Sequence, residues 1–143
     1  MSSSSSIQTA DVVYKHLESN EDLALILRVM EGGTGMTKFW PRRRPERRSF
    51  YLRVETFEIA WYPAGRVGRN ATPEGTVDIR EIQEIRKGRQ SKDFERYPDD
   101  ARRCDEAACF VILYGTEFRL KTLSLVGKYL LLVYRQCLLL RWR

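Results

Sequence analysis

Apolar and polar residues alternate along much of the chain in short runs, which is the pattern of β-strands with one buried face. The clearest run covers residues 49–55, in which Phe50, Leu52 and Val54 share one face. Another run, over residues 36–40, precedes it. Together the two runs predict a pair of neighbouring strands.

Further runs of the same kind predict strands over residues 59–62, 76–85, 109–114 and 117–125. The alternation slips once within residues 76–85, which indicates a β-bulge. About seven short strands separated by polar turns are typical of a small antiparallel barrel or sandwich. The pattern therefore predicts a mainly β fold.

Helical spacing appears near the start of the chain. Asn20 is a suitable N-cap, and the apolar positions that follow it end at Gly32–Gly33, so we predict a short helix there. We predict that residues 1–19 form a flexible, partly helical extension and that residues 20–143 form one domain. The charged segment 87–103 shows neither the alternation of a strand nor the spacing of a helix, and it is predicted to be a long loop.

With 143 residues, of which 43% are hydrophobic, the chain is long enough for one domain with a substantial core. Lysine and arginine total 25 against 19 aspartate and glutamate residues, which gives a formal net charge of +6. This balance favours anionic partners, such as phospholipid headgroups, acidic proteins or nucleic acid. We expect no nucleic acid partner, because no recognised reader motif is present. The aromatic residues fall within strand patterns, and we expect Trp61, Phe110 and Phe118 to lie in the core.

Three cysteines are present, Cys104, Cys109 and Cys137, and no two of them form a C-x-x-C pair. Their odd number leaves at least one thiol unpaired. The amino terminus, with five serines after Met1, has neither the basic nor the apolar part of a secretory signal. We therefore expect reduced thiols in a cytoplasmic protein.

Catalytic chemistry has little support in the sequence. His16, the only histidine, lies in the extension, and Cys109 begins a predicted core strand, so the two do not suggest a base and a nucleophile. Several carboxylates have the pattern of ordinary charged surface: Glu81, Glu84, Asp99 and Asp100. We expect no catalytic residue, no metal ion and no cofactor in this chain.

Arginine is concentrated in one segment between the first two predicted strands, Pro41–Arg48. Its prolines, Pro41 and Pro45, keep it from extending either strand, so we expect the arginines at an exposed tip. Guanidinium groups donate forked hydrogen bonds that suit phosphate oxygens. The segment therefore predicts binding of a polyanion.

Several collinear segments together resemble a known family. They are Pro45–Arg48, Val54–Thr56, Asp78–Arg86, Ser91–Tyr97, Cys109–Gly115 and Phe118–Leu125. In this order they are similar to the amino-terminal pleckstrin homology domain of phospholipase C gamma. The similarity covers residues 23–125 of this chain.

The resemblance implies a seven-stranded, partly open antiparallel barrel that is closed at one end by a carboxy-terminal helix. It also implies that the open end binds a phosphoinositide headgroup, through a lysine near the end of the first strand and an arginine that opens the second. Lys38 and Arg48 match these two places. Strand parity puts Arg48 on the same face as the core residues Phe50 and Leu52.

Other cations extend this predicted site. Those of the loop would attract the surrounding anionic membrane less specifically: Arg42, Arg43 and Arg44. Arg66 and Arg69, in the loop after the third strand, would close the site from another side. Where some relatives carry a second lysine, this chain has Trp40, which predicts weaker binding and a side chain able to enter the membrane interface.

The resemblance ends after Leu125. The family continues into a helix with a tryptophan that plugs the barrel, whereas residues 126–143 form a divergent, leucine-rich segment interrupted by Arg135. This segment is too short and too interrupted to predict a membrane span. We expect it to form a helix that partly replaces the capping helix. Gly127–Tyr129 is also what a splice-donor sequence would encode if read through, which suggests an intronic tail and a truncated isoform.

The resemblance implies a monomeric signalling module that is cytoplasmic and recruited to the plasma membrane by phosphoinositides. The family cleaves phosphatidylinositol bisphosphate in a separate barrel domain with histidines and calcium, and this sequence has no counterpart of that machinery. Two alternatives stay open: an interaction module for an acidic protein partner, and a nonfunctional truncated product. The sequence does not determine which phosphoinositide is preferred, although the family favours phosphatidylinositol trisphosphate.

Overall fold

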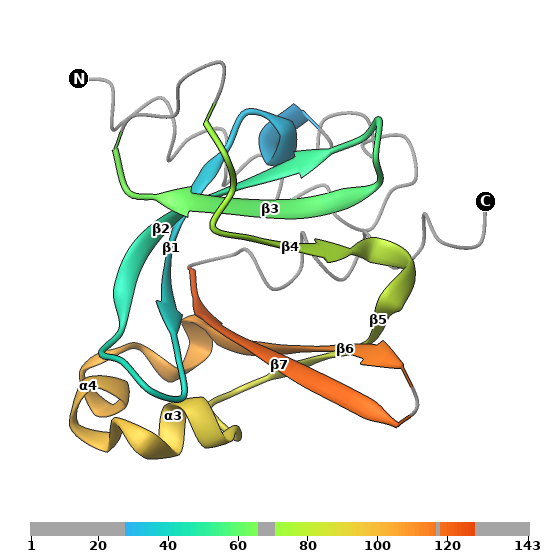
Figure 1. Ribbon diagram of the computed structural model, residues 1–143. Helices are drawn as coiled ribbons and strands as arrows, with labels where there is room; N and C mark the ends of the chain where they lie inside the picture. Colours follow the sequence, from blue (N-terminus) through green and yellow to red (C-terminus); the bar gives the residue numbers. More distant parts are fainter. Residues whose placement is uncertain (1–27, 66–70, 117, 128–143) are drawn as a thin grey trace.

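The computed structural model describes residues 28–65, 71–116 and 118–127, drawn in colour in Figure 1. In these residues one sheet contains seven strands. Their bounds are β1 Thr34–Phe39, β2 Glu46–Arg53, β3 Glu58–Pro63, β4 Gly75–Asp78, β5 Ile82–Lys87, β6 Cys109–Thr116 and β7 Arg119–Val126. The short helices are η2 Ile79–Glu81, α3 Lys92–Arg96, α4 Pro98–Arg103 and η3 Glu106–Ala108.

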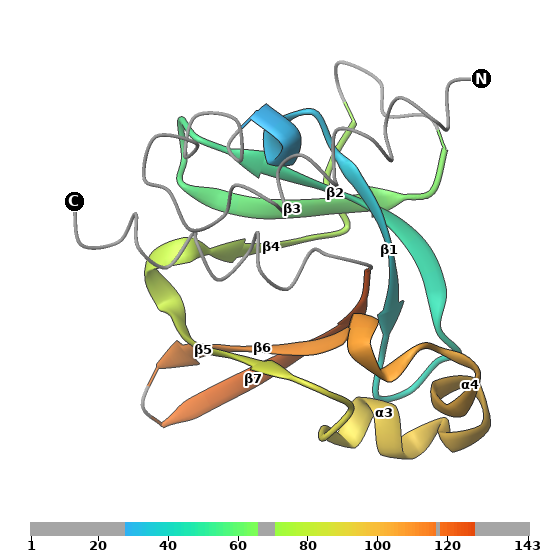
Figure 2. The same cartoon turned by 180° about the vertical axis from the view of Figure 1, so that it is seen from behind.

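All neighbouring strands are antiparallel, in the order β4-β3-β2-β1-β7-β6-β5. Strands β1–β4 and β5–β7 form two parts that face each other across the core (Figures 1 and 2). The sheet is continuous through the β1–β7 pairing, whereas β4 and β5 are its edges and are not paired with each other. The predicted mainly β, seven-stranded and partly open antiparallel architecture is confirmed.

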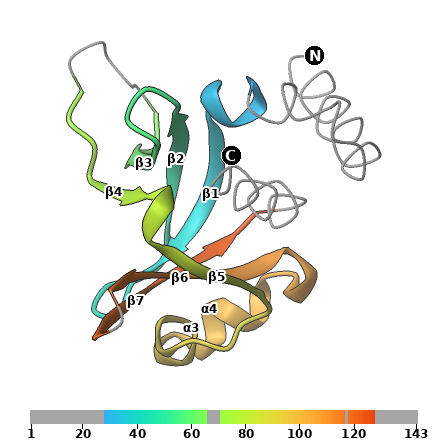
Figure 3. The same cartoon turned by 90° about the vertical axis from the view of Figure 1, so that its right-hand side faces the viewer.

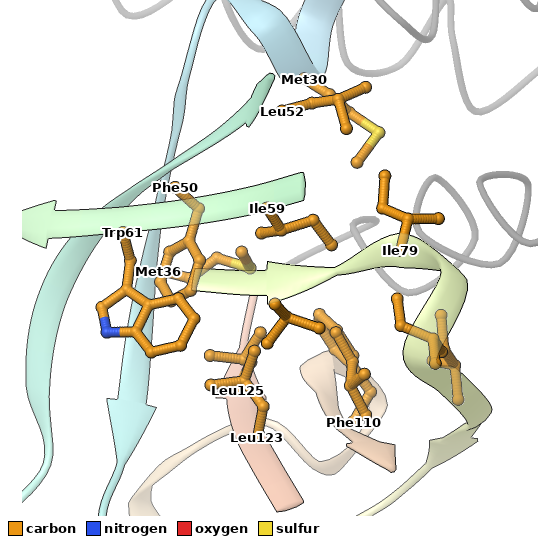
Figure 4. Packing of buried hydrophobic residues seen from close by; sticks show 14 residues of the cluster. Met30, Met36, Phe50, Leu52, Ile59, Trp61, Ile79, Phe110, Leu123 and Leu125 are labelled. Atoms are coloured by element: carbon orange, nitrogen blue, oxygen red, sulfur yellow. The ribbon is translucent and has the colours of Figure 1, made fainter. Parts of the chain in front are cut away.

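The main core lies between the two parts of the sheet, where side chains from both meet (Figure 4). Met36, Phe50, Ile59 and Leu125 are fully buried there. A smaller cluster lies on the outer face of β6, under α3 and α4, and includes Phe39, Phe94, Ala101, Cys109 and Val111. Figure 3 shows the two helices against this side of the sheet. Because successive strand residues point to opposite faces, β6 contributes to both clusters.

Strand β2 confirms the predicted parity, since Arg48, Phe50 and Leu52 are its buried residues. The strand is shifted relative to the prediction: it begins at Glu46, inside the arginine segment, and ends at Arg53. The prediction that Val54 continues the buried face is therefore wrong, because Val54 lies in a turn and is 48% exposed. The predicted bulge is confirmed as a shift of register between Ile82 and Glu84.

The prediction of a long loop over residues 87–103 is wrong, because this segment contains α3 and α4. Each helix is too short to show a helical period, and local caps define it instead. The Ser91 hydroxyl accepts a hydrogen bond from the Phe94 amide at 3.3 Å, and Pro98 occupies the first turn of α4. Phe94 and Ala101 then bury one side of each helix against the sheet.

Trp61 and Phe110 are buried as predicted, but the prediction for Phe118 is wrong. Phe118 lies just before β7, at the β6–β7 turn, and its side chain is 94% exposed. Strand β7 begins only at Arg119, and its first four residues are exposed as well. Alternation alone cannot show where a hairpin turns.

Three predictions fall on residues outside the described ranges: the extension, the beginning of the first helix, and the tail after Gly127. The described part of the helix is a turn over residues 28–31, which ends before Gly32–Gly33 as predicted. Gly33 has a φ of 93°, a conformation that glycine adopts without strain. Within the described ranges no helix has the length and apolarity needed to cross a bilayer.

Candidate anion-binding site

Lys38 and Arg48 lie on adjacent antiparallel strands, near the turn that joins β1 to β2. Lys38 is opposite Glu46, and Arg48 is opposite Met36. Both cations are largely enclosed, with 7% and 6% of their surface exposed. Lys38 has the parity of Met36, and Arg48 that of Phe50, so both residues occupy core-facing positions at the end of their strands.

The indole ring of Trp40 brings these cations together. The distance from its centroid is 4.3 Å to Lys38 Nζ, 4.8 Å to Arg48 Cζ and 4.4 Å to Arg43 Cζ. Trp61 lies on the core side, with its ring centroid 5.6 Å from Lys38 Nζ. Cations within about 6 Å of an aromatic face are attracted by its quadrupole, so the ring offsets part of the repulsion among the three charges.

Burial has the largest effect on the pKa of Lys38. It lowers the pKa of the ammonium from 10.5 to about 8, with smaller lowering effects from Arg43 and Arg48. Asp93 and Glu74 act in the opposite direction, but more weakly. Among the described residues, Lys38 forms no ion pair with a carboxylate. An anion that reached this ammonium would offset the cost of its burial.

Arg48, by contrast, is held by two carboxylates. Its Nε donates to both carboxylate oxygens of Glu74, at 3.0 and 3.2 Å. Its Nη1 donates to Glu46 at 2.9 Å and to the Arg47 carbonyl at 2.8 Å. Burial lowers the pKa of Arg48, but the hydrogen bonds to Glu74 and Glu46 outweigh it, so the net effect is a raised pKa. The guanidinium is charged and fixed in position.

Arg42, Arg43 and Arg44 are exposed in the turn between β1 and β2, as predicted, but their side chains have different partners. Arg43 joins the site, where it also pairs with Glu46 at 3.3 Å. Arg44 turns away and pairs with Asp100 of α4 at 3.7 Å. Arg42 is exposed and lines a separate open hollow of about 600 Å³ with Pro41, Lys92, Glu95 and Arg96. Arg66 and Arg69 lie outside the described residues.

A buried polar network supports the site from the α3 side of the sheet. Asp93 accepts hydrogen bonds from Thr122 at 2.9 Å and from Ser124 at 2.7 Å. Ser124 is also 2.7 Å from Ser91, the N-cap of α3. Ser124 lies opposite Phe39 in the β1–β7 register, so this network fixes the end of β1 next to Lys38.

Sequence reasoning missed both carboxylates that hold Arg48. Glu46 could have been found, because it precedes Arg48 by two residues and shares its face of the strand. Glu74 is 26 residues away from Arg48 in the chain, and no local pattern connects them. The contacts of Trp40 with cations were also missed: its ring is half-buried against Lys38, Arg43 and Arg48, while weaker binding and entry into the membrane interface stay predictions.

The described residues contain no group of three or more histidine, cysteine or acidic side chains that could hold a metal ion. Cys109 is buried, and this burial raises the pKa of its thiol to about 11. A protonated, enclosed thiol is a poor nucleophile at neutral pH. His16 lies outside the described ranges.

The chain is similar to curated phosphodiesterases over most of its length. It is 49% identical over 104 residues to human 1-phosphatidylinositol 4,5-bisphosphate phosphodiesterase gamma-2, an alignment that covers 71% of this chain and 8% of that protein. The rat gamma-2 protein is 46% identical over 102 residues, which cover 70% and 7%. This chain therefore spans less than a tenth of these relatives. No protein-family model matches the chain.

Solved structures show the same fold at much lower identity. The crystal structure of PLC21 from L. pealei superposes with a TM-score of 0.58 at 13% identity, over 78% of this chain and 15% of that one. PLC21 from S. officinalis gives a TM-score of 0.52 at 13% identity, over 76% and 14%. The agreement places the described strands in the architecture found within these larger proteins.

Proposed function

Since the chain belongs to the phospholipase C gamma family as a pleckstrin homology domain, a non-catalytic module, we propose that it binds phosphoinositide headgroups in anionic membranes. Lys38, Arg48 and Arg43 are the proposed contacts for phosphate. The protein would be cytoplasmic and monomeric and would move to the plasma membrane when such headgroups appear there. Arg66 and Arg69 are proposed to complete the site.

The main support for this proposal is the environment of Lys38. Its ammonium is nearly enclosed, has a pKa lowered by burial to about 8, and has no carboxylate partner among the described residues. Keeping such a charge costs folding free energy, and a bound phosphate would recover part of it. Structural lysines more often point to solvent or pair with an acid. A buried lysine without such a partner is a candidate for ligand binding.

The surroundings favour a multiply charged ligand. Arg43 and Arg48 lie against the same indole ring as Lys38, so β1, β2 and the turn between them bring three cations close together. A ring that carries several phosphates needs convergent donors of this kind, because each phosphate oxygen accepts separate hydrogen bonds. The net charge of +6 adds long-range attraction to an anionic surface.

Vesicle sedimentation tests the proposal. The full chain is mixed with phosphatidylcholine vesicles that contain phosphatidylinositol trisphosphate, or phosphatidylserine at the same surface charge. We expect tighter binding to the first, and a loss of roughly tenfold or more in Lys38→Ala and Arg48→Ala. Arg86→Ala is the matched control, because Arg86 is exposed and paired with Glu84 at 3.0 Å, away from the site. Equal binding by all variants would reject the proposed contacts.

An acidic protein partner is the second candidate function. The arrangement around Arg48 favours it, because two carboxylates already fit this guanidinium at hydrogen-bond distance. An acidic peptide would present the same groups. In that case the chain would bind an acidic peptide in a manner that depends on Lys38, and the two vesicle compositions would give equal sedimentation.

A further inference from the structure

We infer that Glu74 and Glu46 limit how tightly this site binds phosphate, because they occupy the donors of Arg48 that the ligand needs. The inference rests on the proposed function and names the residues that set its affinity. Both carboxylates belong to this chain, and both form ion pairs with the guanidinium.

The donor arrangement of Arg48 makes the competition specific. A guanidinium has five N–H donors, which form two forked edges: Nε with Nη2, and Nη1 with Nη2. Glu74 occupies Nε, and Glu46 together with the Arg47 carbonyl occupies Nη1. Nη2 has no partner among the described residues. Each forked edge therefore has one donor already taken, and a phosphate forms a bidentate contact only by displacing Glu74 from one edge, or Glu46 or the Arg47 carbonyl from the other.

Glu74 is held more firmly than Glu46. Its backbone N–H donates to the Trp61 carbonyl at 2.8 Å. The next residue, Gly75, packs so closely on the Trp61 ring that an added Cβ would lie 2.2 Å from a ring carbon. These two contacts fix the backbone from which the Glu74 carboxylate reaches Arg48. Glu46, in comparison, is more than half exposed and is shared between Arg48 and Arg43.

The net charge of the site shows how the two carboxylates affect an anionic ligand. Lys38, Arg43 and Arg48 contribute three positive charges, and Glu46 and Glu74 contribute two negative ones, so the cluster retains one net positive charge. Neutralising one carboxylate doubles this excess, and the uncharged amide that replaces it binds the guanidinium more weakly, so a phosphate displaces it from the forked edge more easily. We expect Glu74→Gln to have the larger effect, because a fixed carboxylate is harder for a ligand to displace than a mobile one.

The test compares Glu74→Gln and Glu46→Gln with the wild-type chain on the same two vesicle compositions. Glu84→Gln is the control: it makes the same charge change and frees Arg86, whose pairing distance of 3.0 Å equals the shortest Glu74–Arg48 distance. We expect Glu74→Gln to tighten binding to phosphatidylinositol trisphosphate vesicles by roughly threefold to tenfold, Glu46→Gln by less, and Glu84→Gln by less than twofold.

Thermal melting is measured in parallel. If Glu74→Gln no longer folds, the comparison of Glu46→Gln with Glu84→Gln decides the question. Folded variants that bind no better than Glu84→Gln overturn the inference, even where the wild-type chain binds. A wild-type chain that does not bind, together with a Glu74→Gln variant that does, supports the inference and rejects the proposed function for the unmodified chain.

Discussion

The ammonium of Lys38 lies 4.3 Å from the centroid of the Trp40 ring, two residues further along the chain. An aromatic face attracts the charge without supplying a hydrogen-bond acceptor, so the donors of the ammonium stay available for a ligand. This relationship distinguishes Lys38 from Arg48, whose donors Glu46 and Glu74 already use.

Replacing Lys38 by methionine should stabilise the fold and abolish binding. Burial lowers the Lys38 pKa from 10.5 to about 8, which corresponds to at most about 3 kcal/mol. Loss of the attraction to Trp40 offsets part of this gain, so we expect a net increase of about 1 to 2 kcal/mol in the free energy of unfolding at pH 7. Urea denaturation measures it. Lys121→Met, at an exposed position, should change little, and a destabilised Lys38→Met would contradict the argument.

Binding should weaken as the pH rises through about 8, because Lys38 then loses its proton. Vesicle sedimentation at pH values from about 6.5 to about 9.5, a range on both sides of the shifted pKa, measures this loss of binding. Lys38→Arg is the control, since arginine stays charged throughout the range and should give a flat profile. If wild-type binding is equally flat, the lysine is not a contact.

Stability should change with pH in the opposite direction. The folded pKa of Lys38 is about 8, below the unfolded value of 10.5, so the unfolded chain binds the proton more tightly. The contribution of Lys38 to the free energy of unfolding therefore increases as the pH rises from about 8 toward 10.5. Comparing wild type with Lys38→Met by urea denaturation isolates it. The stability difference between them should shrink over this window, and a difference that stays constant would exclude a lowered pKa.

Trp40→Leu should weaken vesicle binding severalfold, whereas Trp40→Phe should retain most of it. Leucine keeps apolar bulk but has no quadrupole, so the attraction of the ring for Lys38, Arg43 and Arg48 would be lost and their mutual repulsion would increase. Phenylalanine keeps a weaker aromatic face. If the ring acts only by entering the bilayer, the two variants should bind alike, and the order of their affinities separates the two roles.

Asp93→Asn should destabilise the domain by about 2 kcal/mol, because the carboxylate accepts two short hydrogen bonds in a buried position. Both hydrogen bonds are accepted by the same oxygen, Oδ2, so an amide could keep them, but it lacks the negative charge and adds two donors that need partners. Thermal melting checks the effect. Asp99→Asn is the control, as Asp99 is exposed at the start of α4, and equal melting of both variants would show that the buried network contributes little.

The strands were predictable because each has one buried face, which forces apolar residues into every second position. The same parity puts Arg48 on the face of Phe50, and the burial of both residues in β2 confirms it. Helix α3 was not predictable from periodicity, because five residues make barely more than one turn. Its existence depends on the local Ser91 cap and on the burial of Phe94, and this burial requires the sheet to be in place.

Within the candidate site, the placement of Lys38 and Arg48 on neighbouring strands was predictable, whereas the contact between Glu74 and Arg48 was not. Lys38 and Arg48 belong to one hairpin, so their separation follows from strand geometry. Glu74 reaches Arg48 only because β3 pairs with both β2 and β4, which brings the residue before Gly75 beside the start of β2. No property of Glu74 itself indicates that pairing, which follows only from the order of the strands in the sheet.

The order of the strands has a consequence for how the domain comes apart. The edge strands, β4 and β5, follow each other in the chain and are separated only by Ile79–Glu81. Ile79 and Ile82, at the two ends of this connection, are completely buried. Detaching one edge strand would therefore expose Ile79 and Ile82 to solvent and release the other edge strand as well. Amide protons of β4 and β5 should consequently exchange with solvent as a single cooperative unit.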